Sequence, residues 1–500
     1  MTRRKDDNTV VIKKVNEETG EESMIIRHKD HKKPTNRRDF LATGMIGMSG
    51  LIVAPSILNV LARPNFAYGA EDGSCASSAT GMPAFITVNL SGGASISSNM
   101  PPLDVDRQPL PKYDLLRLGP DQSVFTDDTK GKTMFQGVRV AYSATMPIGG
   151  IWKGIMLRAS QATIDKTSLV AINVSSNDDT SSNMHDASGM IMAAGNTGEL
   201  LPNLGQRNGT GTGVSQTSAI IKSPAALIVN NYTDVAGALA PAGTLAARLT
   251  DSRRKKLLEL VNSLSGSQAR AIATAGSATG STLARVVECG TGKNIQLSDS
   301  KPDINPGLNP AVATVWGINP NTTNSAMYAP ATIAYCALNG NASTGAVEIG
   351  GCDYHGAGAA NQDATDQRAG ELIGRIMETA SILGKTVMIH VVSDGSVSSN
   401  GGDAYAAQGT NDSGSRGTNL MIVFNPNGRP KMKNDSFKHQ IGSFLKGQGA
   451  SDQTPVATPT KAAAAVVANY LHIAGVPDKL DAVAPGIFQR SELDEVIRFA

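Results

Sequence analysis

Residues 345 to 396 constrain the fold of this 500-residue chain more than any other stretch. They open with a short apolar run that ends in two glycines, and they close with a second apolar run at 386–393. Between the runs, apolar side chains recur at helical spacing, namely Leu372, Ile373, Ile376, Met377, Ala380 and Leu383. A strand, a helix and a strand at this spacing predict a βαβ unit with parallel strands.

Similar apolar runs, at 84–90, 168–175 and 419–424, predict three further strands. Helical patterns occupy 151–162, 251–264 and 461–473. Strands that alternate with helices predict an α/β fold, with a mostly parallel central sheet flanked by helices on both faces. We expect a flexible tether at 71–82 and one large α/β domain at 83–500. Loop insertions are expected at about 101–150, 266–327 and 396–418.

The first 70 residues are typical of a signal peptide with a long polar leader. Arg37, Arg38, Phe40 and Leu41 precede an apolar run at 42–61, and small residues follow at 67–70. The paired arginines make this segment resemble a twin-arginine export signal, which implies the twin-arginine translocation machinery as a partner and a periplasmic or extracellular location. The alternative is an N-terminal membrane anchor, because the run is long enough to span a bilayer. Its glycines, serine and proline favour the signal peptide, and then no stable anchor remains after cleavage.

Charge and aromatic content argue against nucleic acid as a partner. The formal charge of +2 comes from the first 70 residues, and the remainder has two more acidic than basic residues. Aromatic residues make up 4% of the chain. Stacking platforms and basic patches are therefore both scarce, and we expect no nucleic-acid binding.

Four cysteines follow the predicted signal peptide, and their spacing fits no zinc motif. An even number in an oxidising compartment allows up to two disulfides. Cys336 and Cys352 flank a predicted hairpin or loop and are the first candidates for a pair. Free buried thiols are the alternative.

Polar residues with ligating side chains follow the two strands of the βαβ unit. Asp353 and His355 come directly after the first strand, and Asp394 directly follows the second. Open α/β sheets bind ligands outside the carboxyl ends of their strands. We therefore expect these three side chains to gather at one edge of the sheet. His390 lies inside the second strand among apolar neighbours, and we expect a buried core histidine with its hydrogen bonds satisfied.

Several motifs together resemble a largely uncharacterised family of twin-arginine-exported bacterial proteins distantly related to alkaline phosphatases and sulfatases. The segments that carry this resemblance are Leu90-Ser-Gly-Gly-Ala-Ser95, Met184-His185-Asp186, Gly350-Gly-Cys-Asp-Tyr-His355, Ser393-Asp394-Gly395 and Gly409-Thr-Asn-Asp-Ser-Gly414. The resemblance implies an alkaline-phosphatase-like fold. It also implies a metal site at the ends of the strands, because related enzymes use bound cations to activate a nucleophile.

The chain departs from the family pattern at two ligand positions. Ser95 stands where the family has an aspartate, and Ser413 stands where it has a histidine. Asp353, His355 and Asp394 remain, with Asp412 as a further candidate ligand. The resemblance therefore implies a degenerate site for one divalent ion, such as zinc, manganese or calcium. The alternative for each aspartate is a structural role, with the carboxylate hydrogen-bonded within its own turn.

Ser95 and His185 are the candidate catalytic residues. Ser95 follows a glycine turn and could act as a nucleophile or help to bind an anion, whereas a plain polar turn is the alternative. His185 could orient a substrate or cap the helix that it precedes. Two functions stay open. The lost ligands favour a non-catalytic binding or structural role, with an anionic small molecule as the ligand. The alternative is a single-metal hydrolase of phosphate or sulfate esters.

Overall fold

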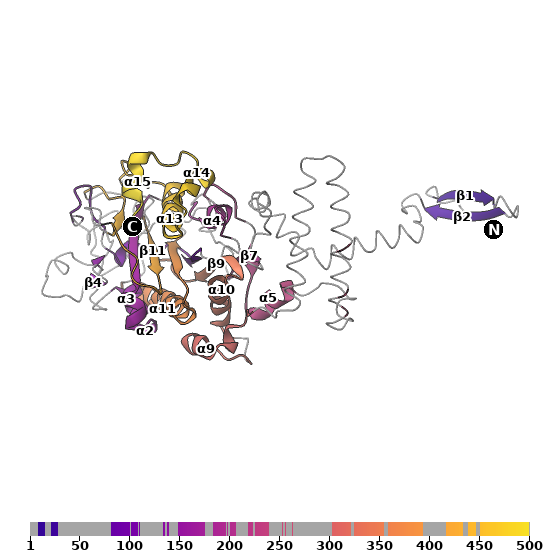
Figure 1. Cartoon of the computed structure of the whole chain (residues 1–500), viewed down its shortest axis with the longest axis horizontal. Helices are drawn as coiled ribbons and strands as arrows, with labels where there is room; N and C mark the ends of the chain where they lie inside the picture. The colour runs from indigo at the N-terminus through magenta and orange to yellow at the C-terminus, as the bar shows by residue number, and fades with distance from the viewer. Residues whose placement is uncertain are drawn as a thin grey trace.

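The computed structural model describes most of residues 82–110, 149–175, 184–206, 219–239, 303–354, 359–393, 417–446 and 451–499, four short strands outside these ranges, and a few single positions (Figure 1). The four strands pair antiparallel two by two. β1 (Thr9–Val15) pairs with β2 (Glu22–His28), and β4 (Met134–Phe135) pairs with β5 (Val138–Arg139). β1 and β2 lie in the predicted polar leader, for which no strands were expected. The residues of the predicted export signal lie outside the described part of the chain.

An eight-stranded sheet forms the centre of the molecule, in the order β12-β6-β11-β10-β3-β9-β7-β8. The strands are β3 (Ala84–Leu90), β6 (Thr167–Val174), β7 (Leu201–Gly205), β8 (Leu227–Ile228), β9 (Ala342–Ile349), β10 (Val387–Ser393), β11 (Gly417–Phe424) and β12 (Gln440–Ile441). β9 and β10 are the strands of the predicted βαβ unit. Both pair parallel with β3, which lies between them.

The sheet is mixed, so the expectation of a mostly parallel sheet was wrong. β11 runs antiparallel to both of its neighbours, β10 and β6, while the other neighbouring strands pair parallel. The physical reason lies in the connection between β10 and β11. Its sequence is polar and glycine-rich and has no apolar helical stripe. A sequence without the pattern of a crossover helix suits antiparallel neighbours, whereas parallel neighbours need a long crossover that is usually helical.

Helices cover both faces of this sheet (Figure 1). One face is covered by α2 (Gly150–Arg158), α9 (Pro310–Trp316), α10 (Tyr328–Leu338) and α11 (Ala359–Leu383). The other face is covered by α4 (Ser188–Ala193), α13 (Pro459–Ile473), α14 (Leu480–Val483) and α15 (Arg490–Val496). The α/β fold class is thus confirmed. The remaining helices are α3 (Gln161–Asp165), α5 (Tyr232–Leu239) and the 3₁₀ turns η2 (Ile96–Ser98), η6 (Pro306–Leu308) and η7 (Pro477–Lys479).

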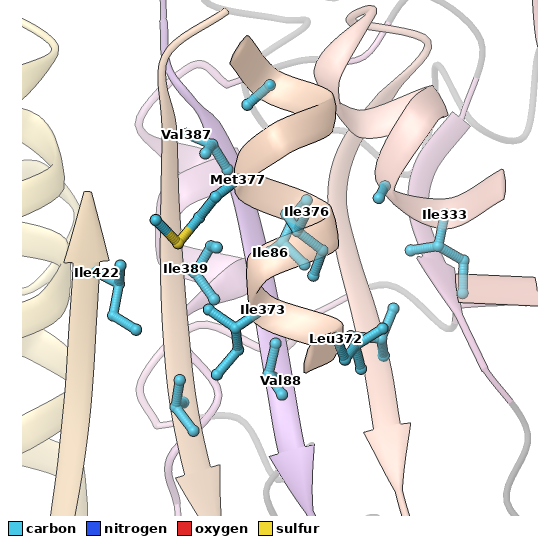
Figure 2. Packing of buried hydrophobic residues seen from close by; sticks show 14 of the residues in the cluster. Ile86, Val88, Ile333, Leu372, Ile373, Ile376, Met377, Val387, Ile389 and Ile422 are labelled. Atoms are coloured by element: carbon cyan, nitrogen blue, oxygen red, sulfur yellow. The ribbon is translucent and has the colours of Figure 1, made fainter. Parts of the chain in front are cut away.

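The apolar stripe of α11 packs on β3 and β10, as the sequence predicted (Figure 2). Ile373 and Ile376 are fully buried against this face of the sheet, and Leu383 at the helix end is partly buried. Within β3, alternate residues point to opposite faces, so Ile86 packs under α11 while Phe85 packs under α13. Full burial of such side chains contributes about 1.5–3 kcal/mol each, which fixes the register of the strand.

The domain boundaries stay predictions, and the structure describes parts of two expected insertions. Residues 102–108 and the strands β4 and β5 lie in the first, and α9 lies in the second. Most of 396–418, and nearly all of the helix expected at 251–264, lie outside the described residues. Among the helices that the structure describes, none combines the length and apolarity needed to cross a bilayer.

Glycines bring α2 and α11 unusually close together. A Cβ atom at Gly154 of α2 would overlap the carbonyl oxygen of Gln367, and one at Gly370 of α11 would overlap that of Ile151. These obstacles are backbone atoms, which cannot rotate away as a side chain can. At the exposed end of the contact, Arg158 donates to a carboxylate oxygen of Glu371 through Nε, at 2.8 Å.

We expect Gly154→Ala to lower the free energy of unfolding by about 2 kcal/mol, because the added methyl group overpacks a backbone contact. Alanine improves helix propensity by only about 1 kcal/mol, which does not offset the overlap. Urea unfolding measures the difference. Gly350→Ala is the control, since nothing lies within 4 Å of its added Cβ. A Gly154→Ala variant as stable as the control would show that the two helices can separate without cost.

Candidate functional site

The carboxyl end of β3 is bracketed by the ends of β9 and β10. On the β9 side, the loop after β3 and the loop after β9 continue side by side beyond the sheet. Ser91 donates its amide to Ile349 O at 3.0 Å, Cys352 donates to Ser91 O at 3.1 Å, and Tyr354 donates to Gly93 O at 3.2 Å. These bonds extend the parallel ladder, so both loops are held at one edge.

On the β10 side, the last residue of the strand fixes the same loop. The Ser393 hydroxyl donates to Leu90 O at 2.9 Å, and the amide of Ala94 donates to the Ser393 oxygen at 2.6 Å. Asp394 is the next residue along the chain and lies outside the described residues, as do His355 and Asp412. The backbone positions that precede Asp394 and that carry Asp353 therefore flank the end of β3.

Asp353 is exposed at this edge, between the two buried residues Cys352 and Tyr354. Gly92, in the loop after β3, allows that loop to pass close to the backbone of Asp353. Gly92 has a φ of +110°, and a Cβ atom there would lie 2.9 Å from the backbone nitrogen of Asp353. Only glycine combines this backbone conformation with so close an approach. The glycine turn after β3 is therefore required for the loop after β9 to place Asp353 beside it.

A buried hydrogen-bond network anchors both loops to the α11 layer. Asp366 of α11 accepts from Tyr354 Oη at 2.6 Å and from Asn99 Nδ2 at 2.7 Å. Asn99 in turn accepts from Ile151 N at 3.0 Å and, through its main-chain oxygen, from Trp152 Nε1 at 2.5 Å. One carboxyl thus joins the loop after β9, the loop after β3 and α2. The sequence interpretation missed this network, although an aspartate among the apolar positions of a helix is a signal for it.

Burial raises the pKa of Asp366 to about 7, although the hydrogen bonds from Tyr354 and Asn99 pull it back toward its ordinary value of 3.8. At pH values between these two, the folded chain holds a proton on this carboxyl that the unfolded chain releases. The contribution of this bound proton to the free energy of unfolding is fully present below pH 4 and is lost as the pH rises toward 7.

Ser95 lies at the edge, but its surroundings do not suit a nucleophile. Its side chain is 1% exposed, and its hydroxyl lies 3.4 Å from that of Ser97. Among the described residues, no hydrogen bond joins Ser95 to an imidazole or a carboxylate. The structure therefore does not bring Ser95 and His185 together as a base and nucleophile pair.

His185 precedes α4 and is buried, at 1% exposure. Its Nδ1 lies 3.2 Å from Nδ2 of Asn419 on β11. Burial lowers the pKa of His185 to about 4, so the ring is neutral near pH 7. The neighbouring Asp186 accepts from Ser223 Oγ and, at 2.8 Å, from the amide of Ser188, which fixes the start of α4. Burial raises the pKa of Asp186.

His390 is buried as expected, but the expectation that its hydrogen bonds are satisfied was wrong. Neither ring nitrogen has a hydrogen-bond partner among the residues that the structure describes. Burial, and the nearby His185, lower the pKa of His390 to about 3. The apolar sequence around His390 indicated burial but not which polar groups share its face of the sheet.

Cys336 and Cys352 are both buried and no disulfide joins them, so their proposed pairing was wrong. Cys336 belongs to α10 and Cys352 follows β9, which runs between them. A strand of eight residues rises about 3.3 Å per residue, which separates the two thiols far beyond bonding distance.

Within the described residues, no three histidine, cysteine or acidic side chains gather closely enough to hold a metal ion. Of the predicted ligands, only Asp353 belongs to this part of the chain. Comparison with protein-family models, with curated proteins and with solved structures finds no match.

We expect Asp366→Asn to change the pH dependence of stability. The wild-type carboxyl contributes a loss of up to about 1.4 kcal/mol per pH unit between pH 4 and pH 7, which the uncharged amide cannot contribute. His185 and His390 act with the opposite sign, since their lowered pKa values make stability rise with pH. Urea unfolding of both chains, from pH 4.5 to 8, isolates Asp366 in the difference between them. A difference that stays constant with pH would contradict the assigned pKa.

Proposed function

We propose that this chain is an exported binding protein that holds one divalent cation, and through it an anionic small molecule, at the carboxyl edge of its sheet. The observation that carries the proposal is the position of Asp353. Its carboxylate is exposed at the sheet edge, on a loop whose flanking residues are both fixed to the loop after β3. A ligand on a pinned loop keeps its position without a bound ion, which lowers the ordering cost of binding.

The neighbouring strand supports the same edge. Ser393 is held by Leu90 and Ala94, so the backbone enters Asp394 from a fixed point beside the end of β3. Asp353 and Asp394 supply carboxylate oxygens, which suit hard ions such as calcium or manganese. His355 and Asp412 are the further candidate ligands. In the proposal, these residues hold the ion, and an anion completes its coordination.

Binding without turnover is favoured over a hydrolase with a serine nucleophile by the surroundings of Ser95 and His185. Ser95 is buried, and its hydroxyl lies 3.4 Å from that of Ser97, while His185 is buried against Asn419. A bound cation would supply charge to attract and orient an anion. A nucleophilic serine would also need a base within hydrogen-bond reach.

Export by the twin-arginine pathway, and a periplasmic or extracellular location, belong to this proposal. Arg37, Arg38, Phe40 and Leu41 carry the export signal in the sequence. The alkaline-phosphatase-like fold is likewise proposed. It rests on the motifs of the sequence and is compatible with the α/β architecture.

Calorimetric titration with Ca²⁺ and Mn²⁺ tests the proposed edge site. We expect one equivalent to bind to the full chain, and Asp353→Ala to weaken binding by more than about tenfold, because a carboxylate ligand is lost. Asp165→Ala is the matched control. Asp165 is also an exposed aspartate, but it lies just before β6, at the opposite end of the strands.

Two results would contradict the proposal. Equal cation affinity in Asp353→Ala and Asp165→Ala would show that the ion is not bound at this edge. Cation-dependent hydrolysis of a phosphate or sulfate ester, lost in Asp353→Ala, would instead establish the hydrolase.

A further inference from the structure

A second group of polar side chains lies inside the molecule, under the α13 face of the sheet. Thr87, Asn89, His185 and His390 form this inner polar cluster, and their side chains are 6%, 2%, 1% and 0% exposed. None of them is part of the edge that carries Asp353. The cluster combines imidazole, amide and hydroxyl groups, and it includes no carboxylate.

Sheet register places these residues on one face. His390 pairs with Thr87 in the parallel ladder of β10 and β3, so both point to the side of Phe85. Asn89 lies two residues farther along β3 and therefore points to the same side. Diagonal neighbours of this kind lie about 7–8 Å apart at Cα, within reach of long side chains.

β11 brings His185 to the same place. Met421 pairs with His390, and Asn419 lies two residues away on the same face. His185 contacts Asn419 at 3.2 Å. The charge of His185 also lowers the pKa of His390. Residues from β3, β10, β11 and the segment before α4 thus converge on one buried position.

The polar atoms of this cluster are unpaired to an unusual extent. The hydroxyl of Thr87, both amide atoms of Asn89, Nε2 of His185 and both ring nitrogens of His390 have no hydrogen-bond partner among the described residues. Each buried unpaired atom costs about 1–3 kcal/mol. Such groups are normally satisfied, so several on one face indicate a bound partner that they share.

We propose that the inner polar cluster is a site for one divalent transition-metal ion, ligated by the imidazoles of His185 and His390 and by the amide oxygen of Asn89. Imidazole nitrogen suits zinc, cobalt, nickel and copper, whereas the oxygens of the sheet edge suit calcium and manganese. The ligating form of histidine is the neutral ring, which a buried, desolvated position favours.

Asn419 acts as the positioning residue for His185. With its amide turned by half a rotation, Oδ1 occupies the position 3.2 Å from Nδ1 and accepts its hydrogen. The lone pair on Nε2 then points away from Asn419 and can ligate. Metal-bound histidines commonly donate their second nitrogen in this way, and the contact fixes the tautomer and the ring orientation.

Cobalt binding tests this site on the full chain. The chain is stripped with a chelator, refolded with one equivalent of Co²⁺, and measured by metal analysis and by visible ligand-field absorption. We expect one tightly held Co²⁺ per chain, an absorption typical of nitrogen ligands, and a higher thermal midpoint than that of the metal-free chain, because the ion joins β3, β10 and the segment before α4.

Four variants locate the ion. His185→Leu and His390→Leu should each weaken Co²⁺ binding by more than about tenfold. His390→Leu should still fold, because Phe85 and Met421 are apolar neighbours. His472→Gln, at the end of α13, and Asp353→Ala should bind Co²⁺ like the wild type.

Three results would overturn the inner site. The first is that the wild-type chain binds no Co²⁺, in which case water would form the hydrogen bonds of the cluster. Both leucine variants could bind Co²⁺ like the wild type. The ion could also be lost in Asp353→Ala alone, which would place it at the edge. Because the edge site is tested with Ca²⁺ and Asp353, failure of one site leaves the other intact.

Discussion

The burial of β3 between two parallel neighbours is the constraint on which the described structure depends. All seven residues of the strand are buried, with hydrogen-bond ladders to β10 on one side and to β9 on the other. Its backbone groups are therefore satisfied within the sheet, and its side chains pack into both cores. The described loop after β9 and the last residue of β10 are both hydrogen-bonded to the end of β3 or to the loop that follows it. Displacing β3 would separate Asp353 from Ser393, the residue that precedes Asp394.

The central position of β3 also sets the chemistry of the two faces. Under α11, alternate residues of β3 are wholly apolar, and the packing there stabilises the fold through area removed from water. Under α13, the same strand presents Phe85, Thr87 and Asn89 in succession. The polar groups on this face reduce stability unless they find a partner. The presence of these polar side chains therefore favours the proposed role in binding over a role in packing.

Local features of the fold could be predicted from sequence, and long-range ones could not. The apolar runs predicted β3, β6, β9, β10 and β11, and the stripe from Leu372 to Ala380 predicted the buried face of α11. Periodicity reports which residues of one element are buried. It does not report that β3 inserts between β9 and β10, which are more than 250 residues farther along the chain, nor that β11 reverses. The edge location of Asp353 could be predicted because strand ends follow from the strands themselves.

Side-chain networks were the least predictable part. Asp366 and His390 each lie in an apolar pattern, and the pattern indicates burial without naming the partner. Asn99 reaches Asp366 across 267 residues of sequence, which no spacing rule anticipates. The failed pairing of Cys336 with Cys352 has the same origin, since closeness in sequence was taken for closeness in space across a full strand.

The central claim is that the ends of β9 and β10 place Asp353 and Asp394 around one ion at the end of β3. Anomalous diffraction from crystals of the chain grown with Mn²⁺ tests this most directly. The account predicts one manganese peak at ligand distance from carboxylate oxygens of both residues, beside the loop that follows Leu90. Peaks found only elsewhere, or the two side chains on opposite faces of the sheet, would contradict it.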